Sequence, residues 1–432
     1  MSRHYASPAH DDAAKAAVAF AANAAAAALP GWSATPTALR VQVLARYLAL
    51  CQQHAEAFVD VLATVHGKTV ADARAEIARG IEMAGYALGS APLFDGELCE
   101  QSARATAPRP SCAPPGVVAG IVPFRLSALV PMWMLVPALA RGHTFILKPA
   151  SRDARAALLH ARLLKLAGLP DGAFNVVQAD DDAVGALVAQ PQVREVSFVG
   201  TDALAHIVRA GAVEHGKRAH LLCAARHHLI VLPDAELALV VDVLIGSVYD
   251  THGERIMPPV VLAVGDVGAR LVAALAARIA AMAPRTRAAS GLPDPHERVE
   301  RLLDEAVAQG AKLVLDRRYH HRQVDAAQRP RPPGCALLDH VTASMTLYKE
   351  DIYAPILCVM RLPDTTTALK LIAARDHHSG VSVFTRDGAA GRALLRRIYN
   401  AAADLNVALP WARGPWGSAP RPIETPDSLP RA

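Results

Sequence analysis

Apolar residues recur at helical spacing through the first ninety residues. One series places its members on a single helical face at three- or four-residue steps: Val41, Leu44, Leu48 and Cys51. A further helix is expected through Phe58 and Val61, with a stop at Gly67. Thr69 and Asp72 then form a T-x-x-D signal, which predicts that another helix begins here.

From position 117 the pattern changes to short β-branched runs separated by amphipathic segments of helical length. The runs are 117–122, 144–147, 174–177, 196–199 and 229–232. Strands that alternate with helices indicate parallel βαβ units, and nearly continuous apolar strands indicate a sheet covered on both faces. The sequence therefore predicts a doubly wound α/β domain of the kind that binds dinucleotides, made of residues 1–95 and 115–232.

A second α/β domain is predicted over 233–405. It should contain a helix at 296–309 and strands at 311–315, near 355–360 and at 381–385. The segment 406–432 is rich in Pro, Gly and Trp without periodicity, and we expect it to be irregular.

Composition limits the class of function. The 432 residues are 52% hydrophobic and 20% charged, with a net charge of +5 spread along the chain, so a nucleic-acid-binding surface is not indicated. Six cysteines without C-x-x-C pairs predict reduced thiols and a cytoplasmic protein. The Ala-rich run 13–29 follows acidic residues and contains Lys15, which favours a soluble helix over a signal peptide.

Several motifs together resemble the aldehyde dehydrogenase family. The segment 116–149, GVVAGIVPFRLSALVPMWMLVPALARGHTFILKP, is similar to the family's stretch from the first nucleotide-fold strand to a ribose-binding lysine. Further matches are 168–177 (GLPDGAFNVV), 197–200 (SFVG), 253–255 (GER) and 349–355 (KEDIYAP). These resemble the CoA-acylating methylmalonate-semialdehyde branch, over about residues 11–410, and we expect the chain to be shorter than that family at both ends. The resemblance also implies that residues 96–114 are a reduced oligomerisation arm.

The resemblance implies covalent chemistry that this chain lacks the residues to perform. The family's thiolate attacks an aldehyde, hydride passes to NAD, and in this branch coenzyme A cleaves the thioester. The cysteine position is Ile256, which has no lone pair with which to attack. The oxyanion-stabilising asparagine is replaced by Arg125, a longer donor that we expect to reach Glu254 or another acid.

One other thiol is a candidate substitute. Cys223 lies in the segment that borders the nicotinamide pocket in the family, although a buried cysteine packing as a small apolar residue is the simpler interpretation. Leu221 stands at the glutamate that serves as base elsewhere in the family and that the CoA-dependent branch also lacks.

Binding positions match the family better. Arg79 and Arg255 correspond to two arginines that hold the substrate carboxylate, a task that suits the planar guanidinium fork. Lys148 matches the lysine at the adenosine ribose, and Gly200 with Thr201 matches the turn facing the pyrophosphate.

The remaining cofactor positions depart in part from the family. Asp351 replaces the nicotinamide-ribose glutamate, and Tyr353 and Phe124 complete the predicted set. Ser151 replaces a ribose-binding glutamate, which weakens NAD binding or admits NADP beside Arg152.

No metal site is expected, because the adjacent histidines 227–228 and 377–378 would point to opposite faces of a strand. Three functions stay open. The first is a pseudoenzyme with carboxylate and dinucleotide binding, acting alone or as regulatory or structural partner of an intact homologue in a homo- or hetero-oligomer. The second is an active semialdehyde dehydrogenase that uses Cys223. The third is a decaying remnant that folds poorly.

Overall fold

The computed structural model describes residues 8–90, 116–223, 227–248, 259–282, 296–316, 335–350, 352, 354–374, 380–398 and 403–407, with the backbone alone at 8–11, 202, 223 and 296. The chain divides into two compact units, unit 1 (residues 1–223) and unit 2 (residues 224–432).

Unit 1 is built on a parallel sheet of five strands in the order β3-β2-β1-β4-β5. Its strands are β1 (Val117–Ile121), β2 (Thr144–Lys148), β3 (Phe174–Val176), β4 (Val193–Gly200) and β5 (Arg218–Cys223). Its helices are α1 (Pro8–Ala34), α2 (Thr37–Gln53), α3 (Ala55–Thr64), α4 (Val70–Gly89), α5 (Leu129–Ala140), α6 (Arg155–Ala167), α7 (Ala183–Ala189) and α8 (Asp202–Glu214). The doubly wound α/β fold predicted from the sequence is thereby confirmed.

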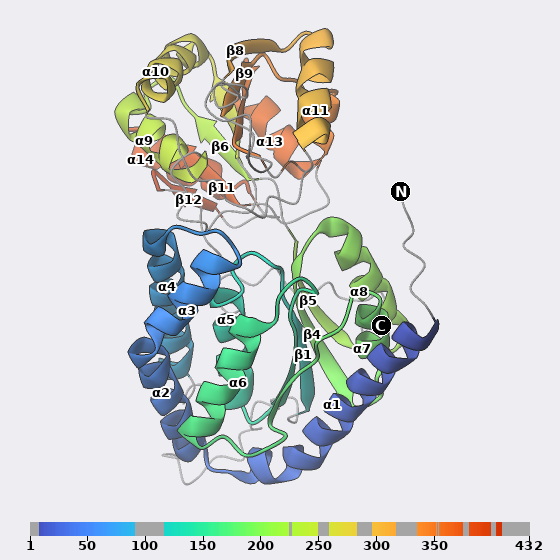
Figure 1. Ribbon diagram of the computed structural model, residues 1–432. Coiled ribbons are helices and arrows are strands. Elements are labelled where there is room, and N and C mark those ends of the chain that lie inside the picture. Colours follow the sequence, from blue (N-terminus) through green and yellow to red (C-terminus); the bar gives the residue numbers. More distant parts are fainter. Residues whose placement is uncertain are drawn as a thin grey trace, which may run out of the picture. The chain divides into compact units, whose positions relative to one another are not determined.

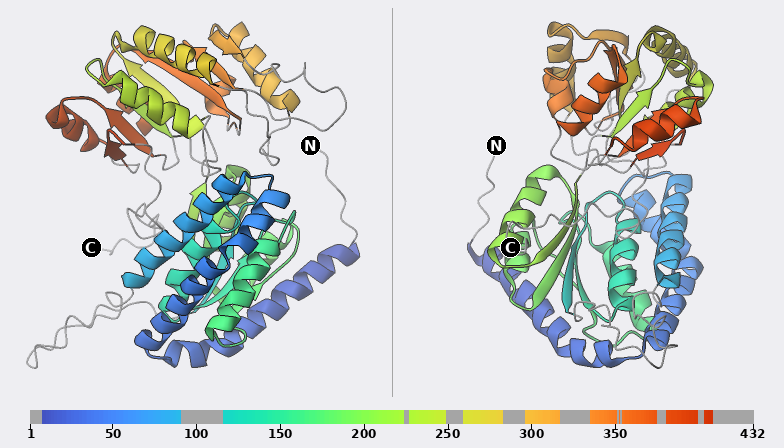
Figure 2. Two further views of the ribbon diagram at one scale, coloured as in Figure 1. Left: turned by 60° about the vertical axis from the view of Figure 1, so that its left-hand side comes forward. Right: turned by 180° about the vertical axis from the view of Figure 1, so that it is seen from behind.

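Helices cover both faces of this sheet. One layer contains α5 and α6, with α2, α3 and α4 packed outside them, and the other contains α1, α7 and α8 (Figures 1 and 2). Every residue of β1, β2 and α5 is buried, as expected for central strands covered on both faces and for a helix packed between the sheet and α4.

Local signals set the helix boundaries. The Thr69 side chain accepts a hydrogen bond from the Asp72 backbone N–H at 3.1 Å, so the T-x-x-D signal does begin α4. Helix α6 ends at Gly168, whose φ of +95° is in the left-handed region that favours glycine. Helix α1 continues through Pro30 to Ala34.

Residues 12–34 of α1 are long and apolar enough, by length and composition alone, to cross a membrane. In unit 1 the same helix contributes Val18, Ala22 and Ala25 to the core beside the sheet. The indole N–H of Trp32 donates to the Leu139 carbonyl at 3.1 Å, which fixes the end of α1 to the end of α5.

Unit 2 contains a seven-stranded sheet in the order β12-β11-β6-β7-β10-β9-β8, parallel except for the β8–β9 pair. Its strands are β6 (His228–Val231), β7 (Val260–Val264), β8 (Lys312–Asp316), β9 (Ala336–Asp339), β10 (Ile356–Leu362), β11 (Val381–Phe384) and β12 (Ala403–Leu405). Its helices are α9 (Leu237–Val248), α10 (Val267–Ala281), α11 (His296–Ala308), α12 (Thr346–Lys349), α13 (Thr365–Ala373) and α14 (Gly388–Leu395).

Successive residues of unit 2 strands enter two different cores. In β6, Leu229 and Val231 pack with α9 and α10, whereas Ile230 packs in the cluster that contains α11 and α13. The predicted strand 229–232 is therefore formed, but it pairs with β7 and β11. It belongs to unit 2, so the division falls at 223/224 instead of the predicted 232/233. The predicted arm at 96–114 lies outside the described residues.

Candidate functional site

The strand order of unit 1 defines where a ligand site is expected. From β1 the chain proceeds outward through β2 and β3, then returns to add β4 and β5 on the other side of β1. In such sheets, ligands bind beyond the carboxyl ends of the strands where the order reverses. The loop after β1 and the turn after β4 meet this description. The first carries Phe124 and Arg125, and the second is Gly200–Thr201.

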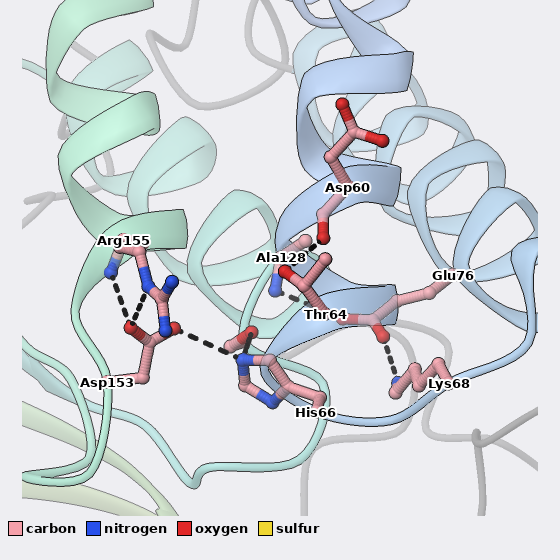
Figure 3. Close-up of polar contacts among 9 residues, drawn as sticks. Asp60, Thr64, His66, Lys68, Glu76, Ala128, Asp153 and Arg155 are labelled. Atoms are coloured by element: carbon pink, nitrogen blue, oxygen red, sulfur yellow. Dashed lines mark hydrogen bonds and ion pairs between the residues drawn. The ribbon is translucent and has the colours of Figure 1, made fainter.

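A buried carboxylate from α4 caps the amino end of α5. Glu76 is fully buried, and its Oε1 accepts hydrogen bonds from the backbone N–H groups of Ala128 (3.0 Å) and Leu129 (3.2 Å). The Lys68 ammonium forms an ion pair with Glu76 Oε2 (Figure 3). The first N–H groups of a helix lack partners inside the helix and favour negative charge. In α5 that demand is met by the protein itself.

A histidine fixes the other side of the same peptide unit. His160 Nε2 donates to the Ala128 carbonyl at 3.1 Å, so Nδ1 accepts from the Tyr47 hydroxyl at 2.8 Å. Complete burial lowers the pKa of His160 to about 3. The loop is thus held on its N–H side by Glu76 and on its carbonyl side by a neutral imidazole.

Arg125, at the predicted oxyanion position, lies in this loop and is half-buried. Burial lowers the pKa of its guanidinium, and the charge of Glu76 acts in the opposite direction. The charge of Glu76 thus acts on Arg125, whereas Glu254, the acid named in the sequence prediction, lies outside the described residues. The next residue, Leu126, is buried with a φ of +62°, a left-handed conformation that is costly for leucine.

A second polar cluster follows the ends of β1 and β2. His66 Nε2 lies 3.3 Å from both Asp153 Oδ2 and Ser127 Oγ (Figure 3 shows the aspartate contact). Both contacts use the same nitrogen, whereas a nucleophilic serine needs the carboxylate on the opposite nitrogen of its histidine. Burial lowers the pKa of His66, and Asp153 opposes that shift. Asp153 also accepts from Arg155 Nε at 2.7 Å, so it organises the loop after β2.

Phe124, in the loop after β1, contacts His66 from the loop between α3 and α4 and Arg152 from the loop after β2. Its ring stacks on His66 with centroids 4.1 Å apart and planes at 19°. The Arg152 guanidinium carbon lies 4.6 Å from the centroid of the Phe124 ring, a cation–π distance. Ser151, beside Arg152, is exposed.

Lys148 ends β2 and is paired across the strand ends. Its Nζ lies 2.7 Å from Asp181 Oδ1, in the loop between β3 and α7. The Lys148 side chain is 1% exposed, whereas that of Asp181 is 65% exposed. The predicted ribose-binding lysine, Lys148, is thus a buried ammonium, and its partner Asp181 is an exposed carboxylate.

The turn after β4 leads directly into α8. Thr201 precedes the helix with extended backbone angles and makes no side-chain cap hydrogen bond within the described residues. A Cβ at Gly200 would lie 2.5 Å from the Phe198 ring, so the turn requires glycine, and the small Ala205 is buried one turn later. In the sheet Gly200 pairs with Cys223, which brings the backbone of the candidate thiol to the same edge.

The predicted substrate-binding and nucleophile positions are only partly described. Arg79 is half-exposed and pairs with Glu82 at 2.9 Å on the surface of α4. The close packing of α4 against α5 explains why position 80 is a glycine, since a Cβ there would lie 2.9 Å from Met132 Sδ and 3.2 Å from Leu129 Cα. Four predicted positions lie outside the described residues: Arg255, Ile256, Asp351 and Tyr353.

Sequence reasoning missed the polar residues that build the β1–α5 loop, namely His66, Lys68, Glu76, Ser127 and Asp153. One local signal was available. Ala73, Ile77 and Gly80 form the buried stripe of α4, and Glu76 stands on the same stripe. A charged residue on an apolar helical face needs a buried partner, so the stripe marks Glu76 as a residue of interest but does not identify Lys68 as its partner.

Comparisons with known proteins agree with this fold. The family model described as "Aldehyde dehydrogenase family" matches residues 6–414. A malonate-semialdehyde dehydrogenase of Pseudomonas aeruginosa is 39% identical over 399 residues, which cover 90% of this chain and 80% of the relative.

Solved structures give the same result. The chain resembles a methylmalonate-semialdehyde dehydrogenase of Oceanimonas doudoroffii with a TM-score of 0.80 and 34% identity, covering 92% of this chain and 85% of the other. A protein of Sinorhizobium meliloti that carries the same enzyme name, solved in complex with NAD, has a TM-score of 0.81 and 33% identity, with coverage of 92% and 83%.

Proposed function

Because this chain belongs to the aldehyde dehydrogenase family, we propose that it is a member that binds a dinucleotide and a small carboxylate but performs no covalent thiol chemistry. The observation that carries this proposal is Ile256 at the end of the Gly253–Ile256 tetrapeptide, where the family has its nucleophilic cysteine. A hydrocarbon side chain has no lone pair and no acidic proton, so no acyl-enzyme can form there.

The residues of unit 1 fit a nicotinamide dinucleotide. The amino end of α8 lies beyond β4 at the reversal of strand order, and its first N–H groups suit a pyrophosphate. Gly200 allows close backbone approach, and Lys148 supplies a buried cation at the end of β2. When bound, NAD supplies a hydride acceptor. The similar protein of S. meliloti was solved with NAD, which supports this choice of cofactor.

The ligand we propose for the substrate side is a short semialdehyde or acid with a free carboxylate. Arg79 and Arg255 are the residues that we expect to hold it, because a guanidinium can grip a carboxylate with two parallel hydrogen bonds. The enzyme name of the P. aeruginosa relative specifies malonate semialdehyde, a compound of this class. Coenzyme A remains a proposed further ligand.

A nicotinamide absorbance assay at high enzyme concentration tests the loss of chemistry. Purified protein is mixed with malonate semialdehyde, coenzyme A and NAD or NADP, and the P. aeruginosa relative serves as positive control. We expect no reduced cofactor from the wild type, even at a single turnover. Ile256→Cys combined with Arg125→Asn, which restores nucleophile and oxyanion donor together, should give measurable turnover because the binding residues remain. Turnover by the wild type would contradict the proposal.

A second candidate function is dehydrogenase activity through Cys223, favoured by its backbone pairing with Gly200 at the strand edge. It predicts wild-type reduction of the cofactor that disappears in Cys223→Ser. Cys358, a buried cysteine of β10, provides the matched control, since Cys358→Ser should leave such turnover in place.

The cellular setting is also a proposal. We expect the protein in the cytoplasm, as a homo-oligomer or as a partner of an intact homologue, and not as a poorly folding remnant. A cooperative thermal transition that moves upward on addition of NAD would support a folded, ligand-binding protein. A broad transition that is indifferent to NAD would favour the remnant.

A further inference from the structure

Among the described residues, both partners of the Lys148–Asp181 pair have unused hydrogen-bonding capacity. An ammonium carries three N–H donors, and Asp181 Oδ1, at 2.7 Å, is the single acceptor recorded for Lys148 among the described residues. The ammonium is buried, so bulk water does not readily fill the remaining two positions. The Asp181 carboxylate is exposed and keeps lone pairs free for a ligand that approaches from solvent.

This combination is suited to hydroxyl groups. A hydroxyl can accept from the Lys148 ammonium and donate to the Asp181 carboxylate at the same time. Two adjacent hydroxyls, as in a ribose 2′,3′-diol, would use the spare donors and the free lone pairs together. The pair stands at the carboxyl end of β2, where Ile121 of β1 is the paired neighbour of Lys148. At this edge of dinucleotide-binding folds, a carboxylate accepts ribose hydroxyls and an arginine accommodates a 2′-phosphate.

We infer that Asp181 recognises the adenosine ribose and makes the chain select NAD over NADP. This inference rests on the dinucleotide binding proposed above. Ser151 stands in the loop after β2 where the resemblance places a ribose-binding glutamate in the family, so this chain has no carboxylate at that position. Asp181 supplies one from the loop after β3 instead, in direct contact with the same lysine.

The Asp181 carboxylate near the strand ends works against NADP, and neither nearby cation is fully available to offset it. A 2′-phosphate would bring negative charge beside the Asp181 carboxylate, and like charges at such a distance repel each other. The cation considered for NADP was Arg152, but its guanidinium is packed against the Phe124 ring. Lys148 attracts a phosphate, yet part of its charge is already balanced by Asp181.

Equilibrium titration calorimetry with NAD and with NADP tests the inference on the full chain. Wild type should bind NAD at least about tenfold more tightly than NADP. Asp181→Asn should weaken NAD and strengthen NADP, so that the ratio of their dissociation constants changes by about tenfold or more. Asp181→Glu keeps the carboxylate and should retain the preference for NAD.

The matched control is Asp182→Asn, the same change of charge one residue along the loop. Asp182 precedes α7 without a side-chain cap hydrogen bond in the described structure, and its variant should leave the ratio unchanged. Thermal unfolding of each variant is measured to establish that it folds, since Asp181→Asn leaves the buried Lys148 ammonium without its carboxylate and should lower the melting temperature.

The possible outcomes separate this inference from the proposed function. If the wild type binds neither dinucleotide, the proposed dinucleotide binding fails and the inference fails with it. If the wild type binds NAD but Asp181→Asn leaves the ratio unchanged, or tightens both ligands equally, Asp181 does not select the ribose. In that case the inference is overturned while the proposed function stands.

Discussion

Helices α5 and α8 both begin where the strand order of unit 1 reverses, but the backbone N–H groups at their amino ends have different partners. At α5, the first N–H groups bond to the buried Glu76 carboxylate, and Lys68 balances its charge. At α8, Thr201 is exposed and makes no side-chain cap hydrogen bond in the described structure. Both ends favour an anion for the same electrostatic reason. Glu76 fills the end at α5, whereas the Thr201 side chain does not cap α8 in the described structure, and this second end is where we propose that the pyrophosphate binds.

The largest test of this contrast removes the anion at α5. Glu76→Gln should lower the free energy of unfolding by about 3–5 kcal/mol, because it leaves the Lys68 ammonium buried without its counter-charge. Urea denaturation measures the loss. Glu56→Gln is the matched control, since Glu56 is an exposed carboxylate paired with Arg74 and its loss should change stability little.

A rescue variant gives that prediction a second test. Adding Lys68→Met to Glu76→Gln removes the unpaired charge and should recover part of the lost stability. Equal stability of the single variant and the wild type would mean that the pair does not hold the beginning of α5.

A change of intermediate size in the free energy of unfolding is expected when the pH is lowered, because His160 bonds to the Ala128 carbonyl of the same loop. In the folded protein the pKa of His160 is about 3, below its ordinary value of 6.5. As pH falls below 6.5 the unfolded chain takes up a proton and the folded one does not, so stability decreases. Between pH 7 and pH 5 this amounts to about 2 kcal/mol from His160 alone.

The contribution of His160 is isolated by comparing wild type with His160→Gln in urea denaturation at both pH values. The wild type should lose more stability between them than the variant does, whatever the variant's stability at pH 7. Identical pH dependence of the two proteins would show that His160 is not held neutral in the fold.

The smallest change in stability should come from filling the open end. Thr201→Asp places a carboxylate at the beginning of α8 and should stabilise the ligand-free protein by about 0.5–1 kcal/mol. The same charge occupies the proposed pyrophosphate position, so NAD affinity should fall by about tenfold. Opposite signs for stability and affinity are the diagnostic result, measured by urea denaturation and calorimetry. A variant that binds NAD as the wild type does would place the anion elsewhere.

Features with local signals could be predicted from the sequence. The beginning of α4 depends on Thr69 and Asp72, three residues apart, and the apolar runs that became β1 and β2 are contiguous. Strand β5 was missed because Arg218 and His220 interrupt its apolar character. Both pair with Glu195 on the neighbouring strand, at 3.3 and 3.4 Å.

Features that depend on distant partners could not be predicted in this way. Strand β6 was assigned to the first sheet because its neighbours β7 and β11 follow it much later in the chain. Glu76 bonds to N–H groups 52 and 53 residues away, a relation that spacing does not encode. The predicted positions Gly200, Thr201 and Lys148 do lie at strand ends of unit 1, but their ligand-binding roles remain predictions.

The Lys68–Glu76 pair also bears on how this chain can change over generations. Replacing either residue alone leaves the other as a buried charge without a partner. Each single mutant is therefore strongly destabilised, and both residues can be lost only by way of such a mutant. A gene released from selection accumulates such single mutations freely. Both members of the pair are present in this chain. Stepwise loss of either residue is therefore opposed by the stability of the fold itself, independently of any activity the protein has.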